Sequence, residues 1–124
     1  MEQCGVIAAT GLVALMDWED KIYEDHMNAA FLAHELWDIK SIDVDHHSVE
    51  TNILRFKVDK KVLKALKTDH RGFVRLLKEE HSVLCNPDFD NAHIRFVTHR
   101  NVSREQCEKA IKAVKSLVAK AGFH

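Results

Sequence analysis

The most regular alternation of apolar and polar positions lies at the C-terminal end of the chain. Ser103 is followed three residues later by Gln106, a spacing typical of the capping box that begins a helix. Apolar residues then recur every three or four positions, so we predict a helix that ends near Gly122. Its buried face should comprise Cys107, Ala110, Ile111, Val114, Leu117, Val118 and Ala121.

The first third of the chain predicts two helices of different character. Residues 3–16 are apolar nearly all round, and helices of this kind are buried on more than one side. We therefore expect this helix to pack against something beyond the domain itself. Residues 18–36 form an amphipathic helix, whose inner face should hold Ile22, Ala29, Ala30, Ala33 and Leu36.

The middle of the chain predicts short strands and helices in pairs. The predicted strands cover residues 42–44, 52–58, 82–85 and 93–98, and the predicted helices between them cover 60–68 and 72–80. A turn-rich stretch, 86–91, separates the last two strands. This order of elements predicts an α+β domain in which a small antiparallel sheet is covered by helices.

Length and composition narrow the class of protein. A chain of 124 residues with 46% hydrophobic content predicts a single domain over residues 1–124. Its net charge of −1 argues against a nucleic-acid partner. The longest apolar run, 6–16, is about half the length needed to cross a bilayer, and no basic flank marks it as a secretory signal. Three widely spaced cysteines predict reduced thiols and a cytoplasmic protein.

One charged residue stands out in the strand predicted over residues 93–98. Ile94 and Phe96 share one face of that strand, so Arg95 points to the other. A guanidinium on a stiff element beside a core is well placed to bind a carboxylate through two parallel hydrogen bonds. The alternative is an edge-strand arginine that lies over apolar surface with its head group in water. Spacing alone leaves both interpretations open.

The nine histidines do not predict a metal site. The neighbours at 46–47 should point apart, and His26 and His34 are too far along one helix to share an ion. His93 and His99 flank a strand, but no carboxylate or thiol lies at a suitable spacing from them. Scattered surface histidines are the simpler interpretation.

No catalytic constellation is visible either. Cys4 falls in an apolar helix and Cys107 on the inner stripe of the last helix, so both are expected to be small core residues, while Cys85 has no obvious base beside it. The chain contains no Ser-His-Asp order, no glycine-rich phosphate loop and no nucleotide fingerprint. We therefore expect no complete active site within these residues.

Four segments together resemble the C-terminal small domain of the L-threonine aldolases. They are Met1-Glu2-Gln3-Cys4-Gly5, Glu24-Asp25-His26-Met27-Asn28-Ala29, Val49-Glu50-Thr51-Asn52-Ile53, and Ile94-Arg95-Phe96-Val97-Thr98-His99 leading to Val102-Ser103. They span most of the chain in the order of the family. The helix predicted near residues 60–70 has no clear counterpart there.

The resemblance implies a fold and a reaction. These aldolases depend on pyridoxal phosphate, have the fold-type I architecture of aspartate aminotransferase, and cleave L-threonine or L-allo-threonine to glycine and acetaldehyde. In the family, a lysine of the large domain holds the cofactor, whose ring acts as an electron sink. The small domain supplies an arginine that binds the substrate carboxylate in the strand before the last helix, a position that Arg95 occupies here.

Two departures from the family affect what this chain can do alone. Glu2 stands where the family usually has an arginine, and no segment resembles the cofactor domain or its lysine motif. We therefore expect a truncated, threonine-aldolase-like lyase fragment of threonine catabolism and glycine biosynthesis that is inactive alone and binds no cofactor covalently. It is expected to form homo-oligomers or to associate with aldolase-like subunits.

Two other readings of the chain remain. It can be a non-catalytic interaction module that associates with aldolase-like subunits, as Glu2 and the missing cofactor domain suggest. It can also be a free-standing α+β domain that binds amino acids. All three readings place the protein away from membranes and nucleic acids.

Overall fold

Two antiparallel strands, β2 (Ile53–Val58) and β4 (Ile94–Val97), form the centre of the computed structural model, which describes residues 2–90 and 92–123. Phe56 lies opposite Ile94, and both are fully buried. The ring of Phe56 meets that of Phe96 edge to face, with centroids 5.0 Å apart. The alternation predicted for both strands is therefore confirmed.

Two short strands complete the sheet. β1 (Ile42–Asp43) pairs with β2, and β3 (Asn86–Pro87) pairs with β4. Over the described residues the sheet has four strands in the order β1-β2-β4-β3, with every neighbouring pair antiparallel. The predicted fold class, an α+β domain with a small antiparallel sheet, is confirmed.

The strand predicted over residues 82–85 is wrong. These residues follow α4 (His70–His81), and Ser82 adopts a left-handed conformation with φ 56°. The backbone N–H of Val83 donates to the carbonyl of Leu77 at 3.0 Å, so the segment is used to end the helix. The ladder begins only at Asn86, inside the stretch that was predicted to be a turn.

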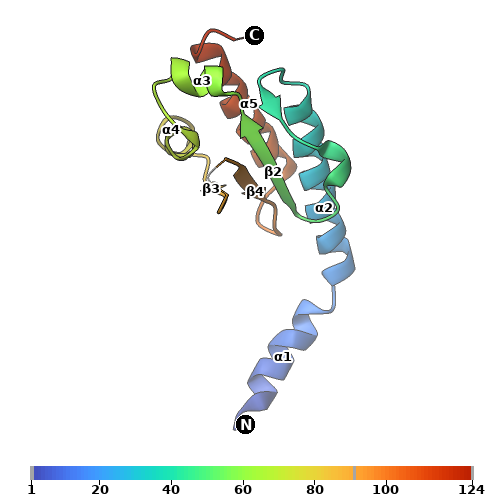
Figure 1. Ribbon diagram of the computed structural model, residues 1–124. Helices are drawn as coiled ribbons and strands as arrows, with labels where there is room; N and C mark the ends of the chain where they lie inside the picture. Colours follow the sequence, from blue (N-terminus) through green and yellow to red (C-terminus); the bar gives the residue numbers. More distant parts are fainter. Residues whose placement is uncertain (1, 91, 124) are drawn as a thin grey trace.

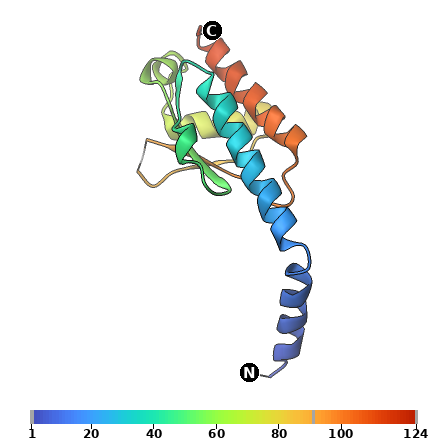
Figure 2. The same cartoon turned by 90° about the vertical axis from the view of Figure 1, so that its right-hand side faces the viewer.

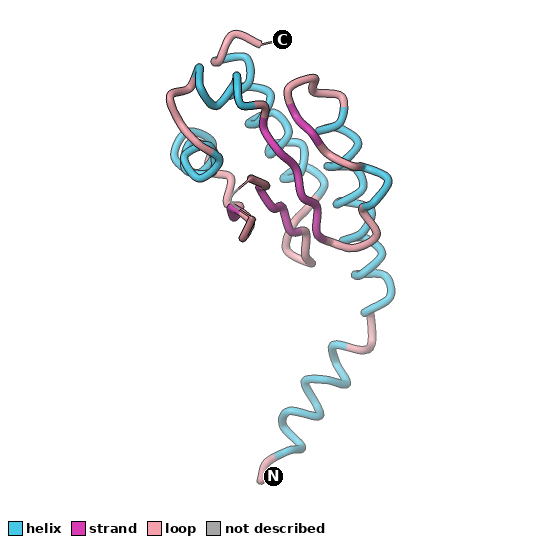
Figure 3. The backbone as a smooth tube through the Cα atoms, viewed as in Figure 1, coloured by secondary structure: helices cyan, strands magenta, loops and turns pink. Residues whose placement is uncertain are grey.

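Two long helices cover one face of the sheet. α2 (Trp18–Trp37) and α5 (Arg104–Lys120) lie side by side behind the strands in Figures 1 and 3. α4 contacts α5 and β3, and α3 (Lys60–Ala65) precedes it. The core between these layers is built mainly from Leu32, Ala33, Leu36, Leu54, Phe56, Phe73, Leu77, Ile94, Ile111, Val114 and Leu117.

The C-terminal helix matches its prediction closely. Ser103 and Gln106 form the predicted capping box, with hydrogen bonds in both directions. Gly122 follows the helix with φ 86°, a conformation that favours glycine. Most of the predicted inner face is buried, although Ala110 and Ala121 are only half-buried.

The inner face predicted for α2 is only partly correct. Ala29, Ala33 and Leu36 are buried as predicted, but Ile22 is 44% exposed and Ala30 is also exposed. The N-terminal turns of α2 extend past the sheet in Figure 2, so Ile22 continues the apolar stripe where no core remains to cover it.

α1 (Cys4–Ala14) projects away from the rest of the fold, as Figures 1 and 2 show. None of its residues is buried, and Val6, Leu12 and Val13 are each at least 66% exposed. The predicted helix is confirmed, whereas the expected burial is not found within this chain. Among the described helices, none is both long and apolar enough to cross a membrane.

Candidate functional site

Arg95 occupies the position that the strand pattern predicted. Its neighbours Ile94 and Phe96 point into the core, and Arg95 is half-buried on the opposite face of β4. Directly across the antiparallel ladder lies Arg55 of β2. Two guanidinium groups therefore share one face of the sheet as cross-strand neighbours. Like charges in this arrangement destabilise a sheet unless something compensates them.

Carboxylates compensate Arg55. It forms ion pairs with Asp88, and with Asp90 at 2.8 Å from one of its terminal nitrogens. Asp90 also contacts the imidazole of His93 and accepts the backbone N–H of that residue at 3.0 Å. Arg55 is thereby tied to the loop that leads into β4.

The same contacts perturb both carboxyl groups of the loop. The backbone N–H of His93 is the largest cause that lowers the pKa of Asp90. The backbone N–H of Phe89 is the largest cause for Asp88, and Arg55 lowers that pKa further. Both carboxylates are therefore stabilised as anions by groups of this chain.

Arg95 has no such compensation. Its Nε is buried and has no hydrogen-bond partner, and no ion pair reaches it from the described residues. A buried donor without an acceptor carries a desolvation cost. Arg95 is thus a cation for whose Nε the described residues supply no acceptor.

Polar side chains from the family-like segments fix the end of the strand that carries Arg95. The hydroxyl of Thr98, which is 1% exposed, donates to the carbonyl of Asp25 at 2.7 Å. The side-chain amide of Asn52 donates to the carbonyl of Thr98 at 2.6 Å, and that of Asn28 donates to Val102 at 3.1 Å. We call these three side chains, Asn28, Asn52 and Thr98, the polar clasp.

The polar clasp explains why the motif residues occur together. It joins α2, the start of β2, the end of β4 and the entry to α5 through groups that are distant in sequence. Buried polar groups that are hydrogen-bonded in this way specify one arrangement of the backbone. The clasp residues are therefore structural, and Arg95 takes no part in their hydrogen bonds.

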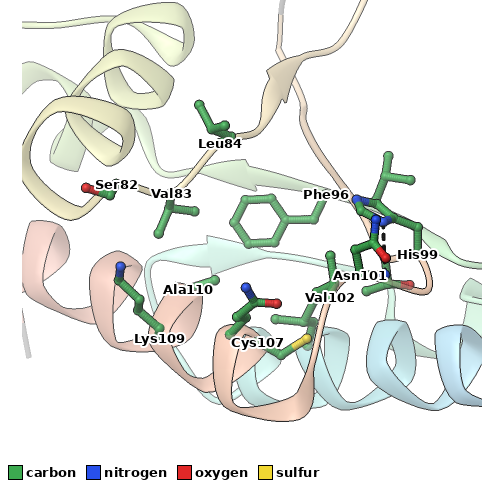
Figure 4. Close-up of a pocket in the computed structure, with 14 residues that line it drawn as sticks. Ser82, Val83, Leu84, Phe96, His99, Asn101, Val102, Cys107, Lys109 and Ala110 are labelled. Carbon is green, nitrogen blue, oxygen red and sulfur yellow. Dashed lines mark hydrogen bonds between the residues drawn. The ribbon is translucent and has the colours of Figure 1, made fainter.

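A cavity of about 350 Å³ lies beyond the end of β4, between the 82–84 segment and the start of α5 (Figure 4). Phe96, Val102 and Ala110 line its apolar part, and the imidazole of His99 accepts the backbone N–H of Asn101 at its rim. Arg95 does not line it. The cavity and the arginine are separate features.

The cysteines do not form a reactive centre. All three are free thiols, and Cys4 is exposed, so its expected place in the core is wrong. Cys107 is buried as predicted, and burial raises its pKa. Burial also raises the pKa of Cys85 to about 12, which keeps it protonated at neutral pH.

Two expectations about the histidines change. The rings of His46 and His47 do not point apart, because a short 3₁₀ turn, η1 (His46–Ser48), brings their centroids to 3.9 Å. His34, Glu35 and Asp38 meet at the end of α2, where each offers a ligand atom within 4.8 Å of the others. This cluster was not predicted from the sequence. The four-residue spacing of His34 and Asp38, which places both on one helix face, was the available signal.

Comparison with known proteins shows which proteins this chain resembles. No protein-family model matches the chain. It is 33% identical over 106 residues to the low-specificity L-threonine aldolase of Escherichia coli, both in strain K12 and in O157:H7. That match covers 86% of this chain and 28% of the relative. A second relative, low-specificity L-threonine aldolase 1 of Arabidopsis thaliana, is 43% identical over 54 residues, which cover 44% of this chain and 15% of that protein.

Solved structures show the same fold. The chain superimposes on the cystine C–S lyase C-DES in complex with its reaction product, cysteine persulfide, with a TM-score of 0.63. The match has 20% identity and covers 85% of this chain and 24% of C-DES. A C-DES mutant with glycine covalently linked to the pyridoxal phosphate (PLP) cofactor matches equally well, over 86% of this chain.

The curated relatives are therefore threonine aldolases, and the solved structures show that the chain has a fold-type I architecture. This chain spans less than a third of the length of the curated relatives that it matches. Within that span, the chain is a relative of the L-threonine aldolase family.

Proposed function

We propose that this chain supplies the side of a threonine-aldolase active site that binds the substrate carboxylate, with Arg95 as the binding residue. The reaction of the whole protein would be the retro-aldol cleavage of L-threonine or L-allo-threonine to glycine and acetaldehyde. One observation carries the proposal: the Nε of Arg95 is buried without an acceptor, while the neighbouring Arg55 forms ion pairs with two carboxylates.

The geometry of the strand suits this role. A carboxylate accepts two parallel hydrogen bonds from a guanidinium, and the pair is stronger where water is partly excluded. Arg95 stands on a strand with a buried core beneath it and the polar clasp at its end. Its backbone therefore needs little reorganisation when a ligand binds, and the bound substrate is oriented by a fixed group.

The lysines of this chain do not fit a covalently held cofactor. PLP, when bound in a family member, supplies an electron sink for cleavage of the carbon–carbon bond. A lysine that holds it is commonly desolvated in a pocket, which lowers its pKa. Among residues 2–90 and 92–123 no lysine is buried, and Lys21, Lys115 and Lys120 are in exposed ion pairs. We therefore assign this chain the carboxylate side of the site alone.

Two measurements test the proposal. Addition of PLP to the purified chain should give no stoichiometric absorbance band from lysine-bound cofactor, and such a band would overturn the division of roles. Calorimetry with L-threonine should show weak binding that Arg95→Ala abolishes. Arg75→Ala, which removes an exposed arginine on α4, is the matched control and should bind as the unmodified chain does. Equal binding by Arg95→Ala would contradict the assignment.

A second candidate function, an interaction module that joins aldolase-like subunits, rests on α1. This helix has no charged residue and no buried residue. Ile7 within it, and Leu15 and Met16 directly after it, are 63–84% exposed. Apolar surface of this extent marks an association site in other proteins. Sedimentation tests it: concentration-dependent association that Ile7→Lys removes would support the module, whereas a strictly monomeric chain would count against it.

A further inference from the structure

We propose that the C-terminal end of α2 binds a divalent transition-metal ion of the Zn²⁺ class, through His34 and Asp38 with Glu35 and His46 beside them. One nitrogen or oxygen atom from each of His34, Glu35 and Asp38 lies within 4.8 Å of the other two. This site is independent of the function proposed for Arg95.

The local structure fixes the first two ligands. His34 and Asp38 are four residues apart at the end of α2, so their side chains project from the same side of the helix. The backbone N–H of Asp38, the C-cap residue, donates to the carbonyl of His34. Both side chains are exposed, which leaves a path for an ion to enter.

A second imidazole, from a separate element, lies near the cluster but is not among the three residues whose ligand atoms meet within 4.8 Å. The ring of His46 in η1 lies 6.3 Å from that of His34 and 4.7 Å from that of Trp37, between centroids. With metal–nitrogen bonds of about 2.0 Å, two imidazoles on one ion have centroids roughly 5–6.5 Å apart. Asp45 caps η1 by accepting the backbone N–H of His47. This hydrogen bond stabilises the turn that carries His46.

The chemistry of the donors selects the ion. Imidazole nitrogen with carboxylate oxygen suits Zn²⁺, Ni²⁺ or Cu²⁺, whereas Ca²⁺ and Mg²⁺ prefer oxygen ligands alone. The end of a helix also carries partial negative charge from its free carbonyls, which favours a cation there. Glu35 forms an ion pair with Lys115 at 3.3 Å that competes with the metal. Binding should therefore depend most on His34 and Asp38.

Isothermal titration of the full chain with ZnCl₂ alone tests the proposal. We expect one equivalent to bind, with affinity reduced about tenfold or more by His34→Ala and by Asp38→Asn. His26→Ala, which removes a histidine two turns earlier on α2, is the matched control and should leave the affinity unchanged. Since both proposed ligands are exposed, their replacement should not unfold the chain, and circular dichroism checks this.

A second readout locates the ion. In a Trp18→Phe background Trp37 is the remaining tryptophan, and Cu²⁺ bound beside it should quench its fluorescence. His34→Ala should remove that quenching at low Cu²⁺ concentration. The proposal is overturned if the chain takes up no Zn²⁺, if His34→Ala binds as tightly as the unmodified chain, or if His26→Ala weakens binding equally.

Discussion

Arg55 and Arg95 are direct neighbours across one antiparallel ladder, yet their environments differ completely. Arg55 is held by Asp88 and Asp90 from the loop before β4. Arg95 has a buried Nε without an acceptor and receives no carboxylate from the described residues. Two arginines on the same face of the sheet therefore differ: Arg55 in β2 is ion-paired to a loop, and Arg95 in β4 lacks an acceptor at its Nε.

The difference shows where the fold gives up stability. A like-charged neighbour and a buried donor without a partner both cost free energy. The ion pairs with the loop carboxylates offset this cost in free energy at Arg55. The same carboxylates do not pair with Arg95. This is the state that the carboxylate-binding role proposed for Arg95 requires, because a bound carboxylate would supply the missing acceptor.

The largest expected effect comes from removing the support that both arginines share. Phe56 lies between them and the helices, fully buried against Phe96. Phe56→Ala should lower the free energy of unfolding by about 3–5 kcal/mol, because it deletes a buried ring and leaves a cavity. Urea denaturation measures this loss. A loss below about 1 kcal/mol would show that the sheet does not rest on this contact.

Low pH should destabilise the fold by protonating Asp88 and Asp90, the carboxylates that pair with Arg55. The pKa values of Asp88 and Asp90 are lowered in the folded chain from the ordinary value of 3.8. Their contribution to stability is therefore complete above that value, and it is lost as the pH falls through the lowered values of the folded state. Melting temperatures measured between pH 6 and pH 2 should fall most steeply below about pH 4.

Substitution separates the causes of that acid sensitivity. Asp90→Asn should flatten the pH profile more than Arg55→Ala does, because a backbone N–H is the largest cause of the lowered pKa for each carboxyl group. If Arg55→Ala removed the whole acid dependence, the ion pairs rather than the backbone would hold the loop.

The smallest effect on stability is expected from substitution of Arg95, and Arg55 provides the comparison. Arg55→Ala removes two ion pairs and should lower the melting temperature by a few degrees. Arg95→Ala removes no pair and relieves a like-charge contact, so the free energy of unfolding should change by less than about 0.5 kcal/mol or rise slightly. Thermal melts of both variants compare them, and equal destabilisation would erase the distinction between the arginines.

The sequence predicted those parts of the fold that local chemistry specifies. The capping box of Ser103, the glycine stop of α5 and the alternation of β2 and β4 each depend on a few neighbouring residues. The strand predicted at residues 82–85 failed because a serine took the left-handed position at the end of α4, which glycine normally marks.

The position of the candidate site could be predicted from the sequence, but the absence of a hydrogen-bond partner for Arg95 could not. Alternation alone placed Arg95 on the outer face of its strand. Its lack of a partner could not be predicted from the sequence, because only the three-dimensional path of the loop assigns Asp88 and Asp90 to Arg55. The exposed apolar surface of α1 likewise depends on packing that no local pattern describes.

The central claim is that Arg95, and not Arg55, is free to bind a carboxylate. Nuclear magnetic resonance of the arginine Nε–H groups tests it most directly while L-threonine is added, with threoninol, which lacks the carboxylate, as the control ligand. The Arg95 signal, identified by its loss in Arg95→Lys, should shift and saturate with L-threonine alone, while that of Arg55 stays in place. A fixed Arg95 signal, or equal shifts of both arginines, would contradict the account.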